Sequence, residues 1–102
     1  MSVAPPFEEV WVELPDGQSM CALINGPRGW LMYLREAGDS GCSSRNPDYD
    51  GPPEAKVEYI LNNGQRDLYP AAWALPIAEV RRALMYFEQE RQRPPFVVWH
   101  EE

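Results

Sequence analysis

Two tight-turn dipeptides, each set between segments of alternating apolar residues, constrain the fold of this chain more than any other feature. Asp16-Gly17 and Asn63-Gly64 tolerate the positive φ that both central positions of a two-residue hairpin turn require. We therefore expect two β-hairpins. Their strands are predicted at residues 9–14 and 19–25, and at residues 56–62 and 65–70.

The alternation within these segments indicates which face of each strand is buried. The apolar residues that share one face are Val10, Val12 and Leu14 in the first hairpin, and Val57, Tyr59 and Leu61 in the second. A further strand is predicted at residues 30–35, WLMYLR, where both faces are apolar. Apolar residues on both faces are typical of a central strand that is covered on each side.

One amphipathic helix is predicted over residues 77–93. Its single apolar stripe, at spacings of three and four, consists of Ile77, Val80, Leu84 and Phe87. A double proline ends the helix, and a short last strand is expected at residues 96–99. These elements predict one α+β domain over residues 1–102, an antiparallel β-sheet meander with one main helix, in the C-terminal half, packed on one face.

The length and net charge of the chain limit the classes of function and partner that it can have. The chain has 102 residues, enough for one modest hydrophobic core, and its formal net charge is −7. Nucleic acids and anionic membranes attract Lys and Arg, so neither is expected as the primary partner. A basic protein is the compatible partner, and the alternative is that the charge only keeps the protein soluble. Without an apolar run near the ~20 residues of a bilayer span or a signal-peptide pattern, we expect a cytoplasmic protein.

The two cysteines have no metal-binding spacing. Cys21 lies in an apolar run, MCALI, and is expected to be a small buried residue. Cys42 falls in a long loop, where it is free to be exposed. Both thiols are expected to be reduced in a cytoplasmic protein, although the sequence leaves a disulfide open as the alternative.

Candidate catalytic groups are few. The single histidine, His100, lies beside Glu101, but neighbours in an extended segment point to opposite sides and would not share a metal ion. The serines Ser40, Ser43 and Ser44 lie outside a GxSxG elbow and far from the histidine in sequence. No phosphate-binding or dinucleotide-binding motif is present. We therefore expect no catalysis, no metal and no cofactor.

The longest stretch without strand or helix periodicity is residues 38–53, GDSGCSSRNPDYDGPP. Loops of this length in compact domains are usually functional or disordered. An Asx turn at Asn46-Pro47 is expected to hold its shape, and an acidic protrusion that carries a tyrosine suits a basic cleft. The alternative is a solvated connector. The candidate partner-binding residues are Asp39, Arg45, Asn46, Asp48, Tyr49 and Asp50.

Three segments, taken in order, carry a resemblance to a known family: GWLMYLREAGDSGCSSRNPDYDG, EYILNNGQRDLYPAAWALPIAEVRRAL and RQRPPFVVWHEE. Over residues 9–102 the chain resembles the first-numbered immunity-protein family of bacterial polymorphic toxin systems. The shared features include a helix followed by Arg93-Pro94 and an ending with Trp99 and Glu101. Many members begin with an additional N-terminal segment that this sequence lacks, so no contact of that segment is carried over.

The resemblance implies a small α+β protein, without catalysis of its own, that binds and blocks a cognate toxin domain. In this family the toxin is most often a nucleic-acid deaminase and sometimes a nuclease. Deaminases that act on polynucleotides present a basic groove. The hypothesis is therefore that the loop of residues 38–53 occludes the basic substrate groove of the toxin.

Two alternatives stay open. The competing contact surface is the acidic C-terminal end, with His100 and Glu101, whereas Trp99 is expected in the core. The competing function is a generic acidic protein-interaction or scaffold module without a toxin partner. In either case we expect a monomer.

Overall fold

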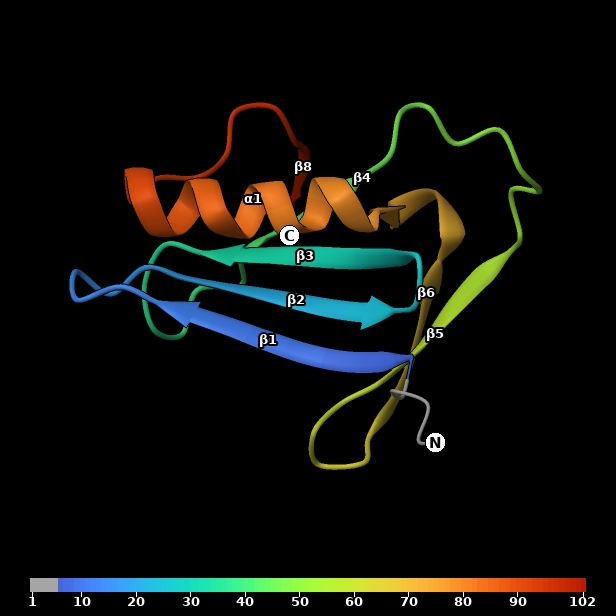
Figure 1. Cartoon of the computed structure of the whole chain (residues 1–102), viewed down its shortest axis with the longest axis horizontal. Helices are drawn as coiled ribbons and strands as arrows, with labels where there is room; N and C mark the ends of the chain where they lie inside the picture. The colour runs from blue at the N-terminus through green and yellow to red at the C-terminus, as the bar shows by residue number, and fades with distance from the viewer. Residues whose placement is uncertain (1–5) are drawn as a thin grey trace, which may run out of the picture.

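A computed structural model of the chain describes residues 6–102 (Figure 1). Its elements are antiparallel strands and one α-helix in the C-terminal half, so the predicted α+β class is confirmed. In chain order they are β1 (Phe7–Glu13), β2 (Ser19–Asn25), β3 (Arg28–Leu34), β4 (Cys42–Arg45), β5 (Lys56–Ile60), β6 (Arg66–Pro70), the 3-10 turn η1 (Ala71–Trp73), β7 (Leu75–Pro76), α1 (Ile77–Glu90) and β8 (Val98–Glu101).

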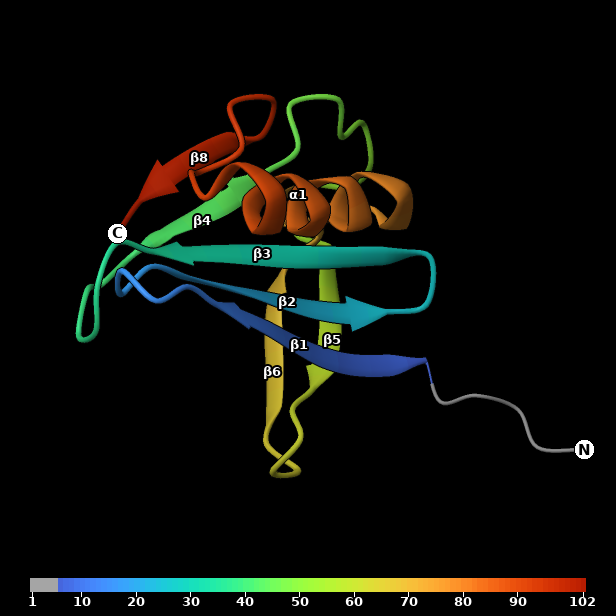
Figure 2. The same cartoon turned by 60° about the vertical axis from the view of Figure 1, so that its left-hand side comes forward.

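The main sheet has the strand order β1-β2-β3-β4-β8, and the short β7 pairs with β3 beside β4. Helix α1 lies across one face of this sheet, which we call the helix face (Figure 1). The hairpin β5–β6 forms its own two-stranded sheet and crosses the opposite face, which we call the hairpin face (Figure 2). The second predicted hairpin therefore exists, but it does not join the main sheet.

Side-chain alternation along β2 and β3 divides the buried residues into two cores, one on each face of the main sheet. The helix-face core includes Met20, Ala22, Ile24, Leu31, Tyr33, Val80, Ala83 and Phe87. The hairpin-face core includes Cys21, Leu23, Trp30, Val57, Tyr59, Ala71 and Ala74. The apolar faces predicted for the first strand and for the second hairpin are confirmed, because their residues pack into these two cores.

Helix α1 ends at Glu90, three residues before the predicted end. Arg91 adopts the left-handed conformation, with φ of 56°, and its backbone N–H donates to the Phe87 carbonyl at 2.9 Å. The side-chain amide of Gln18 donates to the Arg91 carbonyl at 2.9 Å and satisfies a group that the helix leaves unpaired. Among residues 6–102, no helix is long and apolar enough to cross a membrane.

The expectation of one continuous loop over residues 38–53 is wrong, because β4 occupies its middle. β4 pairs with β3 through Met32 opposite Ser43 and Tyr33 opposite Cys42. The segment CSSR has no apolar alternation, yet Ser43 and Ser44 are completely buried. Their hydroxyl groups are satisfied by hydrogen bonds, so the strand needs no hydrophobic pattern.

Ser44 explains how β4 and β7 share one edge of β3. Its hydroxyl accepts a hydrogen bond from the backbone N–H of Leu31 at 3.0 Å and donates to the Trp73 carbonyl at 2.9 Å. The hydroxyl therefore replaces a ladder hydrogen bond at the point where β4 diverges from β3. Beyond that point Gly29 pairs with Leu75 of β7.

The last strand is also displaced from its predicted position at residues 96–99. β8 begins at Val98, because its register is set by pairing with β4, from Arg45 opposite Val98 to Cys42 opposite Glu101. His100 and Glu101 therefore belong to a strand rather than to a solvated tail. The residue before the strand, Val97, is buried in the helix-face core.

Both cysteines are buried and free. Cys21 belongs to the hairpin-face core and Cys42 to the helix-face core, so the main sheet separates the two thiols. Burial raises the pKa of the Cys21 thiol to about 12. Cys42, which its place in the predicted loop left free to be exposed, is buried, and this arrangement leaves no route to a disulfide between the two residues.

Candidate partner-binding surface

The mostly exposed segment that follows β4 is residues 46–55, which we call the acidic loop; it extends two residues beyond the predicted loop and projects from the body of the molecule between β4 and β5 (Figure 1). Asn46 anchors it. The Asn46 backbone N–H donates to the Ala72 carbonyl at 2.8 Å, and the side-chain amide donates to the Ala74 carbonyl at 3.1 Å. The side-chain oxygen accepts the backbone N–H of Asp48 at 3.0 Å, which confirms the predicted Asx turn.

Tyr49 holds the acidic loop in shape through contacts on its inner side. Its hydroxyl donates to the Pro52 carbonyl at 2.7 Å, and its side chain packs against the hairpin-face core. A Cβ at residue 51 would lie 2.6 Å from the Tyr49 hydroxyl oxygen, so Gly51 permits this close approach. The loop is thus held in one shape by its own contacts.

Three carboxylates project from this loop. Asp48, Asp50 and Glu54 are all exposed, and none lies within ion-pair distance of an arginine or lysine among residues 6–102. Asp48 and Asp50 also line a shallow hollow of about 350 Å³ beside Arg28 and Pro76. The acidic loop therefore presents negative charge that internal contacts do not neutralise.

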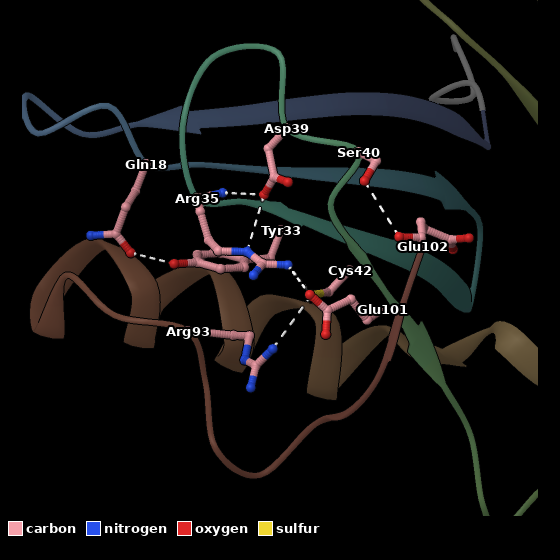
Figure 3. A network of polar contacts seen from close by, with 9 residues as sticks. All are labelled: Gln18, Tyr33, Arg35, Asp39, Ser40, Cys42, Arg93, Glu101 and Glu102. Carbon is pink, nitrogen blue, oxygen red and sulfur yellow. Dashed lines mark hydrogen bonds and ion pairs between the residues drawn. The ribbon is translucent and has the colours of Figure 1, made fainter.

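Asp39, by contrast, is engaged by Arg35 (Figure 3). The Asp39 carboxylate accepts the Arg35 backbone N–H at 2.9 Å and its side-chain Nε–H at 3.2 Å. This backbone hydrogen bond is the main reason why the pKa of the Asp39 carboxyl lies below its usual value. Arg35 also forms an ion pair with Glu101 of β8, so one guanidinium joins two of the candidate residues.

Arg45 is the end of a stack of aromatic rings on the hairpin face. Its guanidinium carbon lies 3.9 Å from the centroid of the Trp73 ring, which stacks on Tyr69, which in turn stacks on Trp30. The guanidinium donates to the Ser43 hydroxyl at 2.9 Å. Burial lowers the pKa of the Arg45 guanidinium from its usual value. Nη1 of this arginine is therefore engaged within the protein, by the Ser43 hydroxyl and the Ser44 carbonyl.

His100 is exposed on β8 and lies opposite Ser43 of β4. The Ser43 hydroxyl donates to a carboxylate oxygen of Glu102 at 2.5 Å, and no hydrogen bond joins it to His100. Glu101 points toward Arg35 instead, as Figure 3 shows. The part of the chain that the structure describes holds no group of three His, Cys, Asp or Glu side chains that could bind a metal.

Trp99 has a structural environment. It packs against the helix-face core, and its indole N–H donates to the Pro94 carbonyl at 2.9 Å. This hydrogen bond closes the segment that connects α1 to β8. The expectation that Trp99 lies in the core is confirmed.

The structure divides the candidate residues into three places. Asn46, Asp48, Tyr49 and Asp50 lie together in the acidic loop, Asp39 and Glu101 meet at Arg35, and Arg45 lies with His100 on the hairpin face of β4 and β8. Sequence reasoning missed Glu54, which follows the double proline taken as the end of the loop. Extending the search for acidic residues beyond that proline pair would have found it.

The chain matches the protein-family model described as Immunity protein Imm1, over residues 3–101. This match spans nearly the whole sequence, including the acidic loop and β8. No curated protein matches the chain. The family match confirms the resemblance noted from the three sequence segments, and it implies a cognate toxin as partner. The chain belongs to the Imm1 family of immunity proteins.

Proposed function

We propose that this immunity protein neutralises a toxin domain that acts on nucleic acid, a deaminase in the first place, by placing the acidic loop in the basic groove that binds the toxin's substrate. The protein performs no chemistry in this proposal. It acts in the cytoplasm of the toxin-producing cell, where it competes with the nucleic acid for one surface. A nuclease would offer a similar basic groove, and it is the second candidate target.

The observation that carries the proposal is the set of three exposed carboxylates on a loop of fixed shape. Charges that lack internal partners raise the rate of association with a basic surface. A loop that is already ordered loses little conformational entropy on binding, so more of the interaction energy appears as affinity. Asp48, Asp50 and Glu54 meet the first condition, and the contacts of Asn46 and Tyr49 meet the second.

In this proposal the candidate residues have different roles. Asp48 and Asp50 contact the toxin directly, while Asn46 and Tyr49 position them. The end of the main sheet that carries His100 and Glu101, with Asp39 and Arg45 behind it, is the competing contact surface. Its carboxylates lie in ion pairs with Arg35 and Arg45 of the same protein, which makes it a weaker electrostatic partner for a basic groove.

The first experiment is co-expression with the toxin domain encoded beside this gene, scoring growth and purifying the complex. Rescue of growth with a one-to-one complex is expected. The purified toxin, assayed on single-stranded DNA and RNA for deamination and for strand cleavage, identifies the reaction. Deaminase activity that the immunity protein abolishes supports the full proposal, whereas cleavage activity redirects it to a nuclease.

The second experiment tests the loop. Asp48→Lys with Asp50→Lys should weaken toxin binding by at least about tenfold, since like charges then face each other. The matched control is Glu36→Lys with Glu90→Lys, which makes the same change of charge at exposed positions outside the loop. Equal affinities for the two double variants would show that the acidic loop is not the inhibitory surface.

A further inference from the structure

The outer edge of β1 is open. β1 is the first strand of the main sheet, and the described residues provide no strand that pairs with its other edge (Figure 1). Alternate residues of an edge strand turn their backbone N–H and C=O groups away from the sheet. Alternate residues of the seven-residue β1 therefore present a row of unpaired backbone donors and acceptors. Such a row is a template for another strand.

An apolar groove runs beside this edge on the helix face. Helix α1 packs mainly over β2 and β3, and it leaves a hollow of about 500 Å³ between itself and β1. The apolar side chains that line the hollow are Val10, Val12, Leu84 and Met85. Met85 is 60% exposed, and on the opposite face of the strand Trp11 is 43% exposed. Apolar side chains thus flank the open edge on both faces.

The charges around this edge indicate what kind of chain segment could bind there. β1 carries the exposed Glu8 and Glu13 and no basic residue, while Glu9 accepts hydrogen bonds from the Asn62 backbone N–H and the Trp11 indole. Glu88 lies in the groove together with the single cation Arg81. A second copy of this chain would bring further carboxylates and no basic residue on its β1 to this edge, so it offers no charge complementarity. An extended segment that alternates apolar and basic side chains could make all three kinds of contact. Its backbone would hydrogen-bond to β1, its apolar side chains would pack in the groove and its basic side chains would pair with the carboxylates.

We propose that the β1 edge accepts an extended segment of the toxin domain, with alternating apolar and basic residues, as an added strand of the main sheet. This inference rests on the proposed function for its partner, but it names a surface distinct from the acidic loop. Met85 and Val12 provide the apolar contact, and the backbone of β1 provides the hydrogen bonds. The added strand would anchor the immunity protein while the acidic loop covers the groove.

The other edge strand fits such a segment less well. β8 has only four residues, and Glu101 within it is paired with Arg35. Val98 is nevertheless 50% exposed there, which makes it a matched control for Met85. Both side chains are at least half exposed in the free protein, so a lysine is tolerated at either site, and Met and Lys have similar helix propensities.

The experiment measures binding of the toxin domain encoded beside the gene to the wild type, Met85→Lys and Val98→Lys. Met85→Lys is expected to weaken binding by at least about tenfold, because a lysine meets the basic segment in a desolvated groove, and Val98→Lys to change it less than about twofold. Hydrogen exchange of the wild-type complex is expected to show new protection of alternate β1 amides. Urea unfolding verifies that both variants are folded.

Three outcomes overturn the inference. If Met85→Lys binds with unchanged affinity and the β1 amides exchange as fast as in the free protein, the β1 edge is not a toxin-binding surface. The proposal for the acidic loop is unaffected by that result. Light scattering that shows a dimer of the free protein, lost in Met85→Lys, assigns the edge to a second copy. Absence of any complex with the toxin domain overturns this inference together with the proposed function. Conversely, loss of binding in Met85→Lys but not in the Asp48→Lys, Asp50→Lys variant supports toxin binding at the β1 edge. The same result contradicts toxin binding by the acidic loop.

Discussion

The two halves of the stretch from residue 38 to residue 53 both lack strand and helix periodicity, yet they behave differently in the molecule. In the first half, residues 38–45, polar side chains make contacts with other parts of the same protein. Asp39 binds Arg35, Ser44 bridges two backbone segments and Arg45 stacks on Trp73. The second half, residues 46–53, leaves its aspartates exposed and without ion-pair partners among the described residues. Polar side chains thus hold the sheet together in the first half, whereas the aspartates of the second half stay exposed to solvent.

This comparison teaches that a carboxylate is available for recognition only when no neighbour has engaged it. An exposed ion pair contributes roughly 0–1 kcal/mol to stability, but it removes most of the field that a charged partner would sense. Substitutions in the first half should therefore change the free energy of unfolding. Substitutions in the second half should change affinity for the toxin instead.

The largest expected effect is at Gly41, in the first half. Its φ is +85°, and an added Cβ would lie 2.7 Å from a methyl carbon of Leu34 and 2.9 Å from the Tyr33 carbonyl oxygen. Gly41→Ala should lower the free energy of unfolding by about 3 kcal/mol, from backbone strain and overpacking together. The control is Gly38→Ala, where φ is +84° but nothing lies within 4 Å; it should cost only about 1 kcal/mol. Urea unfolding measures both, and equal losses would contradict the packing argument.

Ser44→Ala should come next. The substitution leaves the Leu31 N–H and the Trp73 carbonyl without their buried partner, at a cost of about 2 kcal/mol in the free energy of unfolding. Ser40→Ala, at an exposed position, should cost almost nothing. Titration calorimetry should find the toxin affinity of folded Ser44→Ala unchanged. A large loss of affinity without loss of stability would show that Ser44 contributes to toxin binding rather than to the stability of the sheet.

Asn46 lies at the boundary between the two halves, so its substitution should affect both quantities. Asn46→Ala removes the Asx turn and the hydrogen bond to Ala74, which should cost about 1 kcal/mol of stability and also weaken toxin binding. Asn46→Asp keeps the acceptor for the Asp48 N–H and should retain more of the affinity. If both variants bind like the wild type, loop order does not contribute to recognition.

The smallest effect is expected at Asp39, and it depends on pH. Its pKa in the folded protein is below the ordinary value of about 3.9, so the ionised carboxylate stabilises the fold above that pH. This contribution is lost as the pH falls through the folded pKa. The wild type should therefore lose more stability between pH 7 and about pH 3 than Asp39→Asn does. Equal losses in urea unfolding at the two pH values would show that the Arg35 contact does not matter.

Local signals in the sequence determined much of the fold. The Asp-Gly and Asn-Gly turns, the alternation around Val10 and Val57 and the apolar stripe of α1 each act over a few residues, so they can be read without knowing the tertiary structure. The Asx turn at Asn46 belongs to the same class, because it joins residues two positions apart.

Only the tertiary structure decided the rest. β4 has no hydrophobic pattern, because its serines are buried against hydrogen-bonding groups as distant as Trp73, 29 residues along the chain. Arg35 reaches Glu101 across 66 residues, and this pairing determines which carboxylates stay free. The sequence by itself thus determined both hairpins, the central strand, the helix and the acidic composition. Which acidic side chains remain available to a partner was decided by contacts between distant segments, because burial and pairing depend on neighbours that only folding brings together.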